Sequence, residues 1–150
     1  MARTQGRYRY VQGGLGQGLG VALGAKLALG DRLVAFTAGD GSWLYNPVLP
    51  GLMASAEYGL PVLVVVFNNG KYLSMRHNHR RVYPDSVAAR TGYQLGVNLS
   101  AQPDAAAVAA AAGAAGFTVA TARELAPALE KAVATVRGGQ TAVVNVSLTR

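Results

Sequence analysis

The sequence predicts a three-layer α/β fold, in which a mainly parallel sheet is covered by helices on both faces. Two observations lead to this fold class. Short apolar runs rich in β-branched residues, such as Val-Leu-Val-Val-Val-Phe at 62–67, are typical of strands buried on both sides. Segments with helical spacing of apolar residues separate these runs, and this alternation favours a parallel sheet. A length of 150 residues with 51% hydrophobic content is sufficient for one domain with a core.

The first half of the chain predicts a helix followed by a strand, a helix and a second strand. An Ala-rich helix is expected after the glycine-rich segment at 13–16. A strand is expected at 33–38, and a helix at 46–58 that ends before Gly59. The second strand is expected at 62–67. Ligands of open parallel sheets bind beyond the carboxyl ends of the strands, so the residues that follow these strands are the first candidates for a site.

The second half predicts two more helices and two more strands. Thr121 and Glu124 have the spacing of a capping box, which marks the start of the last helix. The expected elements are an Ala-rich helix opened by Pro103-Asp104 and closed by Gly113, a strand at 117–119, a helix from Thr121 to Gly138, and a strand at 141–146.

Composition excludes several classes of protein. The chain contains no cysteine, which excludes disulfides, zinc sites built from cysteine and thiol catalysis. No apolar run approaches the length of about 18 residues needed for a membrane span, and the Arg-rich start lacks the apolar stretch of a secretory signal. A cytoplasmic location with no membrane contact is therefore expected.

A net charge of +7 requires nucleic acid to be considered as a partner. The strongest basic cluster is Arg-His-Asn-His-Arg-Arg at 76–81, but it lacks the aromatic residues that stack on bases, so no nucleic-acid binding is expected. Two interpretations of this segment stay open. Arg76, His77 or His79 meets a substrate carboxylate or acyl group, or the segment is a solvated basic loop. Neither histidine is assigned a catalytic role.

Polar residues follow both strands of the first strand-helix-strand unit. Gly-Asp-Gly-Ser at 39–42 follows the first strand, and Asn-Asn at 68–69 follows the second. A carboxylate and an amide oxygen at neighbouring strand ends suit Mg²⁺, which commonly takes one or two protein carboxylates together with phosphate and water oxygens. Glycines remove side chains where a backbone must approach a phosphate. Either motif alone would be interpreted as a turn.

Two other nucleotide motifs are absent. A Gly-x-Gly-x-x-Gly fingerprint in the glycine-rich segment would need glycine at positions that hold Leu19, Val21 or Leu23. Lys26 is not part of the Gly-Lys-Ser/Thr ending of a P-loop. A dinucleotide fold and ATP hydrolysis by a P-loop are therefore not predicted.

The combined motifs resemble a known signature. Gly39-Asp40-Gly41 with Asn68-Asn69 resembles the thiamine diphosphate (ThDP) signature of the superfamily that contains acetolactate synthase, benzoylformate decarboxylase and pyruvate decarboxylase. Gly13-Gly14-Leu15-Gly16 resembles the pyrimidine-binding segment of that superfamily, and Tyr58-Gly-Leu-Pro-Val62 resembles its lead into the second strand. The similarity covers most of residues 10–147. It implies the ThDP-binding fold of the C-terminal, diphosphate-binding domain.

The resemblance implies a metal site and a cofactor site. For Mg²⁺, Asp40 and Asn69 would supply side-chain oxygens, and Lys71 its backbone carbonyl. For ThDP, Gly13 would accept a hydrogen bond from the aminopyrimidine, and Leu15 would wedge under the bent cofactor. The remaining implied cofactor-binding residues are Gly39, Gly41 and Ser42 at the diphosphate, and Asn68 as a brace of the loop.

The resemblance also implies a missing part. In the superfamily, a glutamate of a separate pyrimidine-binding domain activates the cofactor. The chain holds only Glu57, Glu124 and Glu130, on predicted helices away from these strand ends, so no catalytic residue is assigned. Residues 1–150 are predicted to be one ThDP-binding domain, either a truncated copy or a separately encoded subunit. A pyrimidine-binding domain on another chain or a missing segment is the expected partner, within a homodimer or tetramer.

The function implied by the resemblance is ThDP- and Mg²⁺-dependent decarboxylation or carboligation of 2-oxo acids, of the acetolactate synthase or decarboxylase type. The isolated chain is expected to be inactive. A non-catalytic binding or regulatory module with the same fold is the alternative, although Asp40 and Asn69 speak against it because a module without cofactor has no need of a buried carboxylate. An unrelated Mg²⁺-phosphate enzyme is disfavoured by the segment at 13–16.

Overall fold

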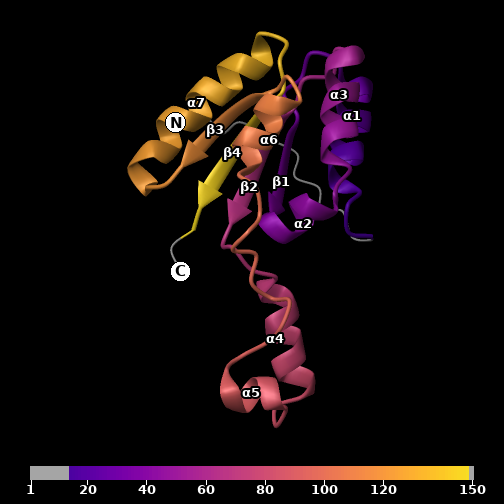
Figure 1. The fold of residues 1–150 in the computed structure, drawn as a ribbon. Coiled ribbons are helices and arrows are strands. Elements are labelled where there is room, and N and C mark those ends of the chain that lie inside the picture. Colours follow the sequence, from indigo (N-terminus) through magenta and orange to yellow (C-terminus); the bar gives the residue numbers. More distant parts are fainter. Residues whose placement is uncertain (1–13, 149–150) are drawn as a thin grey trace, which may run out of the picture.

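Four parallel strands form one sheet in this computed structural model, which describes residues 14–148 (Figure 1). The strands are β1 (Ala35–Gly39), β2 (Leu63–Asn68), β3 (Ala115–Val119) and β4 (Ala142–Ser147), in the spatial order β1-β2-β4-β3. All three neighbouring pairs are parallel. The α/β fold class predicted from the sequence is confirmed, and each strand lies within two residues of its predicted position.

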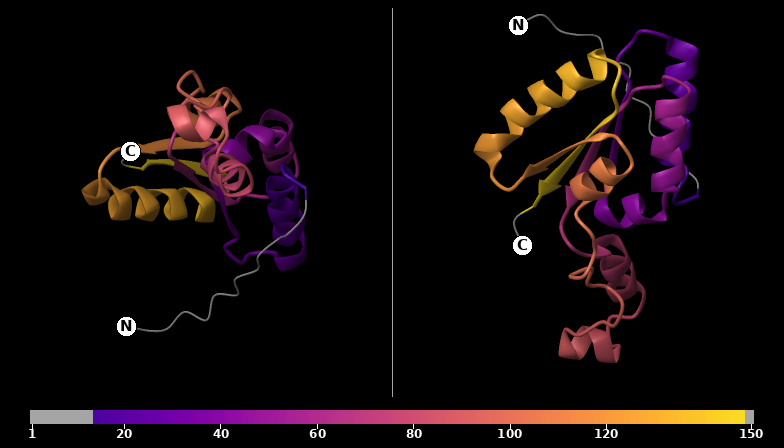
Figure 2. Two further views of the ribbon diagram at one scale, coloured as in Figure 1. Left: turned by 90° about the horizontal axis from the view of Figure 1, so that it is seen from below. Right: turned by 45° about the horizontal axis from the view of Figure 1, so that its top comes forward.

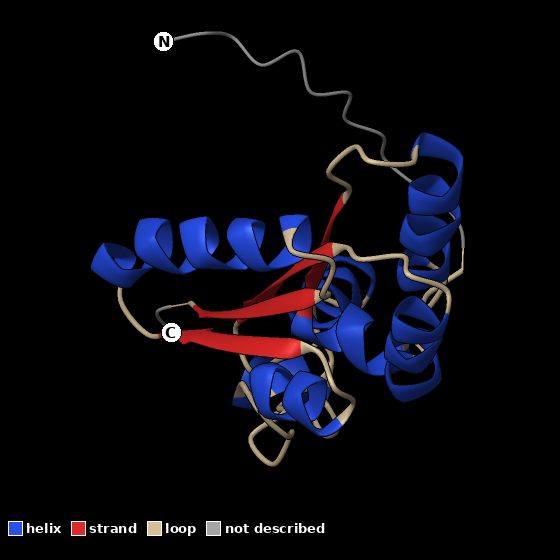
Figure 3. Cartoon of the chain, turned by 90° about the horizontal axis from the view of Figure 1, so that it is seen from above, coloured by secondary structure: helices blue, strands red, loops and turns tan. Residues whose placement is uncertain are grey.

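Helices cover both faces of the sheet (Figure 3). The described residues contain α1 (Gly18–Leu29), α2 (Asp40–Tyr45), α3 (Val48–Glu57), α4 (Leu73–Val82), α5 (Val87–Thr91), α6 (Ala105–Ala111) and α7 (Ala122–Arg137). Helix α7 packs on one face, against β2, β3 and β4. Helices α1, α2, α3 and α6 contribute to the core on the other face.

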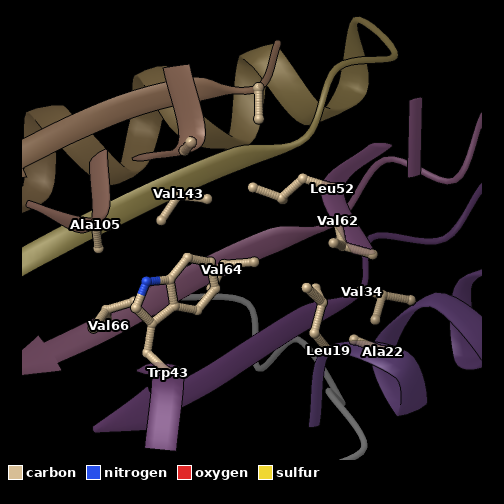
Figure 4. Packing of buried hydrophobic residues seen from close by; sticks show 12 residues of the cluster. Leu19, Ala22, Val34, Trp43, Leu52, Val62, Val64, Val66, Ala105 and Val143 are labelled. Atoms are coloured by element: carbon tan, nitrogen blue, oxygen red, sulfur yellow. The ribbon is translucent and has the colours of Figure 1, made fainter. Parts of the chain in front are cut away.

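Alternation along the strands divides the buried residues between two cores. In β2, Val64 and Val66 belong to the core under α1, α3 and α6, whereas Leu63 and Val65 belong to the core under α7. Figure 4 shows the first core, in which the indole of Trp43 lies beside the β2 valines. These strands are apolar on both faces because both faces are covered.

The capping signals also act as predicted. Thr121 and Glu124 form the capping box of α7. Asp104 caps α6, because its carboxylate accepts hydrogen bonds from the N–H groups of Ala106 at 2.7 Å and Ala107 at 3.1 Å. Partial burial raises the pKa of Asp104, but hydrogen bonds, including one from Asn145, outweigh this effect and hold the pKa below its ordinary value.

The helix predicted at 46–58 is confirmed as α3, which begins two residues later, at Val48, and ends one residue earlier, at Glu57. The segment after β1 forms a further short helix, α2, which the sequence did not predict. Pro47 explains why α2 and α3 are separate helices, because proline disfavours helical backbone in the residue before it. Asn46 accordingly has extended backbone, with φ of −71° and ψ of 148°. The Gly-Asp-Gly motif is therefore a direct passage from strand to helix and not a loop.

Helices α4 and α5 project beyond the carboxyl ends of the strands (Figures 1 and 2). We call residues 73–96 the α4–α5 arm. In the interpretation of 76–81 as a solvated basic loop, the loop is wrong, because Arg76, His77 and His79 lie on α4, whereas no residue of α4 is buried. Neither α4 nor α5 contains a buried residue, in contrast to the helices that cover the sheet.

Among the helices of residues 14–148, none combines the length and apolar character needed to cross a membrane.

We expect Gly116→Ala to destabilise the fold. A Cβ at Gly116, in β3, would overlap the carbonyl oxygen of Ala106 in α6, and backbone on both sides leaves little room for adjustment. Overpacking of this kind costs about 1 to 3 kcal/mol. Urea denaturation measures the change in the free energy of unfolding. Gly20→Ala is the control, because Gly20 is exposed in α1 with no atom within 4 Å of its added Cβ. An unchanged Gly116→Ala protein would contradict the close packing of α6 on β3.

Candidate functional site

Strands β1 and β2 end side by side, and this places the two polar motifs at one edge of the sheet. Gly39 at the end of β1 pairs with Phe67 near the end of β2. Asp40 is the next residue after β1, and Asn68 is the last residue of β2. The structure thus brings together two predicted site segments that lie far apart in the sequence.

The carboxylate of Asp40 is the buried centre of this edge, with a residue exposure of 3%. Its Oδ1 accepts a hydrogen bond from the N–H of Gly41 at 2.9 Å. Its Oδ2 accepts hydrogen bonds from the N–H groups of Gly70 at 2.7 Å and Lys71 at 3.2 Å. The loop that follows β2 is therefore folded around the carboxylate that follows β1.

A buried carboxylate is costly unless an opposite charge or hydrogen bonds compensate for it. Within residues 14–148, the hydrogen bonds accepted by Asp40 all come from uncharged amides, either backbone N–H groups or the Gln102 side chain. The negative charge of Asp40 thus remains available to a cation. Its carboxylate oxygens are ligands that suit a hard ion such as Mg²⁺.

The same described residues hold no cluster of three or more His, Cys, Asp or Glu side chains. A metal bound at Asp40 would therefore depend on amide, carbonyl and phosphate oxygens for its other ligands.

Asn68 and Asn69 shape the loop after β2. The Oδ1 of Asn68 accepts the N–H of Gly70 at 2.9 Å, and the Oδ1 of Asn69 accepts the N–H of Lys71 at 2.9 Å. Gly70 has a φ of 67°, a left-handed conformation that glycine adopts without strain. An amide oxygen has two lone pairs, so the bond to Lys71 leaves Asn69 able to contact a further ligand.

A second connection closes the base of the α4–α5 arm. The N–H of Tyr72 donates to the carbonyl of Val97, and the N–H of Leu99 donates to the carbonyl of Gly70, both at 2.8 Å. These bonds bring the chain that leaves the arm, residues 97–102, back to the Asp40 edge.

Gln102 is a residue of this edge that the sequence did not reveal. Its Nε2 donates to the Oδ1 of Asn68 at 2.8 Å and lies 3.3 Å from the Oδ2 of Asp40. Gln102 belongs to no motif and stands 62 residues from Asp40 along the chain. Its only signal in the sequence is its place just before Pro103-Asp104, the predicted start of a helix.

Tyr72 packs over the Gly-Asp-Gly motif. A Cβ on Gly41 would lie 2.6 Å from the ring atom Cδ1 of Tyr72, so only glycine allows this contact. The rings of Tyr72 and Tyr45 are 6.1 Å apart between centroids. Partial burial is the largest cause that raises the pKa of Tyr72, followed by Tyr45 and then the carboxylate of Asp40. Tyr72 therefore stays a neutral hydroxyl at physiological pH.

Asn46 joins the start of α1, just after the glycine-rich segment, to the Asp40 edge. Its Oδ1 accepts the N–H of Leu19 at 2.9 Å, and its Nδ2 donates to the carbonyl of Ser42 at 2.8 Å. Asn46 is buried, with 7% exposure. The start of α1 is thereby fixed against α2.

The glycine-rich segment itself lies close against the end of α2. Gly16 has a φ of 91°, and a Cβ there would overlap the carbonyl oxygen of Tyr45. Leu15 is 60% exposed. Of the predicted cofactor-binding residues, Gly39, Gly41, Ser42 and Asn68 lie at this edge, Leu15 lies in the turn just before α1, and Gly13 lies outside the described residues.

The fold and the edge geometry define a three-layer α/β domain with a buried, cation-compatible carboxylate at the carboxyl ends of its parallel strands. The sequence matches, over residues 2–146, the family described as thiamine pyrophosphate enzyme, C-terminal TPP binding domain. The chain belongs to this family of thiamine pyrophosphate (ThDP) enzymes, as its motifs predicted.

Individual relatives agree with this assignment. The chain is 33% identical over 136 residues to the acetolactate synthase isozyme 3 large subunit of Escherichia coli (strain K12), covering 91% of this chain and 22% of the relative. It is 39% identical over 75 residues to benzoylformate decarboxylase of Pseudomonas aeruginosa, covering 49% and 14%. A ThDP-dependent 4-hydroxybenzoylformate decarboxylase from Rhodococcus jostii RHA1 superposes with a TM-score of 0.74 at 31% identity, covering 90% of this chain and 23% of that structure.

The chain thus spans less than a quarter of the length of these relatives. They are larger proteins in which the matched region is one part.

We expect Asn46→Ala to loosen the link between α1 and α2. The substitution leaves the buried N–H of Leu19 unpaired, which costs about 1 to 3 kcal/mol, and removes the bond to the partly buried carbonyl of Ser42, which adds about 1 kcal/mol. Urea denaturation should show a loss of about 2 to 4 kcal/mol, and hydrogen exchange should be faster at Leu19. The exposed Asn78 supplies the control, since Asn78→Ala should change stability by less than about 0.5 kcal/mol. Equal behaviour of the two variants would contradict the role of Asn46.

Proposed function

We propose that this chain binds ThDP together with Mg²⁺ and serves an enzyme that decarboxylates or carboligates 2-oxo acids. The observation that carries the proposal is the buried Asp40 carboxylate, whose described hydrogen-bond donors are uncharged. Bound ThDP supplies carbanion stabilisation, and the protein supplies binding, orientation and electrostatics.

The proposed metal ligands are the side-chain oxygens of Asp40 and Asn69 and the backbone carbonyl of Lys71. Asp40 provides the charge, and its orientation is held by the N–H groups of Gly41 and Gly70. Asn69 and Lys71 lie on the loop that folds around that carboxylate. One carboxylate with neutral oxygens matches the way Mg²⁺ is commonly bound beside a phosphate.

The proposed cofactor-binding residues surround this metal site. Gly39 and Gly41 leave the backbone open to the diphosphate, and Ser42 lies on α2 beside them. Asn68 braces the loop through its bond to Gly70. On the other side of the Asn46 link, the exposed Leu15 is the proposed wedge beneath the cofactor, and Gly13 is the proposed acceptor for the aminopyrimidine.

The reaction class rests on the relatives. Acetolactate synthases and benzoylformate decarboxylase are among them, and so is the sulfoacetaldehyde acetyltransferase of Alcaligenes xylosoxydans xylosoxydans, 30% identical over 92% of this chain and 21% of its own length. These names support a ThDP enzyme acting on a small carbonyl substrate. A 2-oxo acid is the proposed substrate of the complete assembly, and a cytoplasmic location is proposed with it.

A further domain is proposed to complete the site. Among the three glutamates, Glu57 lies at the end of α3, and Glu124 and Glu130 lie on α7, which packs on β2, β3 and β4 and has no comparable packing on β1. The carboxylate of Glu124 is already engaged in the capping box. The activating glutamate is therefore proposed to come from a pyrimidine-binding domain, on another chain or another segment, within a homodimer or tetramer.

The α4–α5 arm supports such a partner. Six of its large apolar side chains are at least half exposed: Met75, Val82, Tyr83, Val87, Tyr93 and Leu95. An exposed apolar surface of this kind marks a protein contact. Because the arm starts at the loop that holds Asp40, a domain seated on it would also lie beside the proposed cofactor site.

Calorimetry with ThDP, with and without Mg²⁺, tests the proposed binding. We expect binding that requires Mg²⁺ and that weakens at least about 100-fold, or about 2.7 kcal/mol, in Asp40→Asn, since this variant removes the charge but preserves the shape. Asp31→Asn is the control, because Asp31 is exposed after α1. A folded chain, verified by circular dichroism, that binds no ThDP would refute the proposal and favour a module that keeps the fold alone.

A turnover assay tests the proposed dependence on a second domain. Purified 150-residue chain, saturated with ThDP and Mg²⁺, is expected to release no carbon dioxide from pyruvate above the rate of the cofactor in buffer. The physical reason is that no glutamate of the described residues is positioned to activate the pyrimidine. Steady decarboxylation by this chain alone would show that the proposal of a separate activating domain is wrong.

A further inference from the structure

Gln102 connects the ends of two strands through one amide group. Its Nε2 donates to the Oδ1 of Asn68 at 2.8 Å and reaches the Oδ2 of Asp40 at 3.3 Å. Asp40 follows β1, and Asn68 ends β2. Gln102 itself comes from the loop between the α4–α5 arm and α6, so three distant segments of the chain meet at this nitrogen.

Without Gln102, the Oδ2 of Asp40 would keep the N–H groups of Gly70 and Lys71 as donors, whereas the Oδ1 of Asn68 would keep only that of Gly70. The N–H of Gly70 is shared between the same two oxygens, at 2.7 Å from Asp40 and 2.9 Å from Asn68. The backbone donor and the side-chain donor thus hold the Asp40 carboxylate and the Asn68 amide in one relative orientation. Unlike the donor of Gly70, the donor of Gln102 can be removed by substitution without changing the backbone.

We propose that Gln102 is a positioning residue for the metal site, which completes the orientation of the Asp40 carboxylate, beside the backbone N–H donors, through its amide contacts with Asp40 and Asn68. The inference rests on the proposed function, because it assigns Gln102 a task at the Mg²⁺ site proposed for Asp40. Gln102 is assigned no contact with the metal or with the cofactor.

A comparison of the affinities for Mg²⁺ and Ca²⁺ distinguishes a positioning role of Gln102 from a role in general stability. Mg²⁺ demands a nearly ideal octahedron at about 2.0 to 2.1 Å, whereas Ca²⁺ accepts irregular sets of six to eight oxygens at about 2.3 to 2.6 Å. A carboxylate that has lost its orientation therefore weakens the Mg²⁺ site more than the Ca²⁺ site. Partial unfolding of the region would weaken both ions to the same degree.

The test measures the dissociation constants of Mg²⁺ and Ca²⁺ by calorimetry at saturating ThDP in wild-type protein and in Gln102→Met. Methionine has a similar length and cannot donate. We expect the Mg²⁺ dissociation constant to rise about tenfold, equivalent to about 1.4 kcal/mol, and that of Ca²⁺ to rise less than about threefold. Gln140→Met is the matched control, because Gln140 also donates through Nε2, to the carbonyl of Gly113 at 3.0 Å, but lies outside the edge.

The possible results have distinct meanings. Loss of Mg²⁺ affinity with Ca²⁺ affinity largely kept, and no change in Gln140→Met, supports the inference. Unchanged constants in Gln102→Met, or equal losses for the two ions, overturn it while wild-type binding leaves the proposed function intact. Failure of the wild-type chain to bind either ion with ThDP overturns the proposed function and this inference with it.

A second variant covers the case in which Gln102→Met does not fold. Gln102→Asn keeps the amide but withdraws it by one methylene, so both contacts lengthen beyond hydrogen-bond distance. As in Gln102→Met, the dissociation constant of Mg²⁺ is expected to rise more, relative to wild type, than that of Ca²⁺. A Gln102→Asn protein with the wild-type ratio of the two constants would overturn the inference.

Discussion

The burial of one carboxylate determines how the functional edge of this domain is built. Asp40 is removed from water at the point where β1 becomes α2, and it is stabilised by amides of Gly41, Gly70, Lys71 and Gln102. Loss of these amides would leave an uncompensated charge in the interior. The loop after β2 and the chain before α6 must therefore close on Asp40, and this requirement gives the edge its defined shape.

Close approaches between backbone segments make that arrangement possible. Gly16 lies against the end of α2, Gly41 lies beneath the ring of Tyr72, and Gly116 lets α6 pack directly on β3. A Cβ at any of these positions would meet atoms already in place. Asn46 then locks the start of α1 to α2 with both ends of its side chain.

The α4–α5 arm lacks the close packing of the rest of the domain. It carries no buried residue in either helix, and its apolar side chains face solvent, so packing within residues 14–148 does not account for its conformation. The arm begins at the loop that binds Asp40 and returns at the loop that contains Gln102. A partner seated on the arm would consequently act on both sides of the proposed metal site, and the proposed pyrimidine-binding domain has a physical route to influence it.

The sequence by itself determined the fold class, the strands and the capped helices, because apolar runs, helical periodicity and capping residues act over a few neighbouring positions. It also identified Asp40 and the Asn68-Asn69 pair as candidates and assigned the family. Tertiary structure alone decided the short helix α2, whose six residues are too few to show a helical period, and the helical arm, whose helices bury no residue. It also decided the contacts of Asn46 and Gln102. Side chains that meet across 27 or 62 residues leave no local pattern, because only the paired strand ends bring their partners into reach.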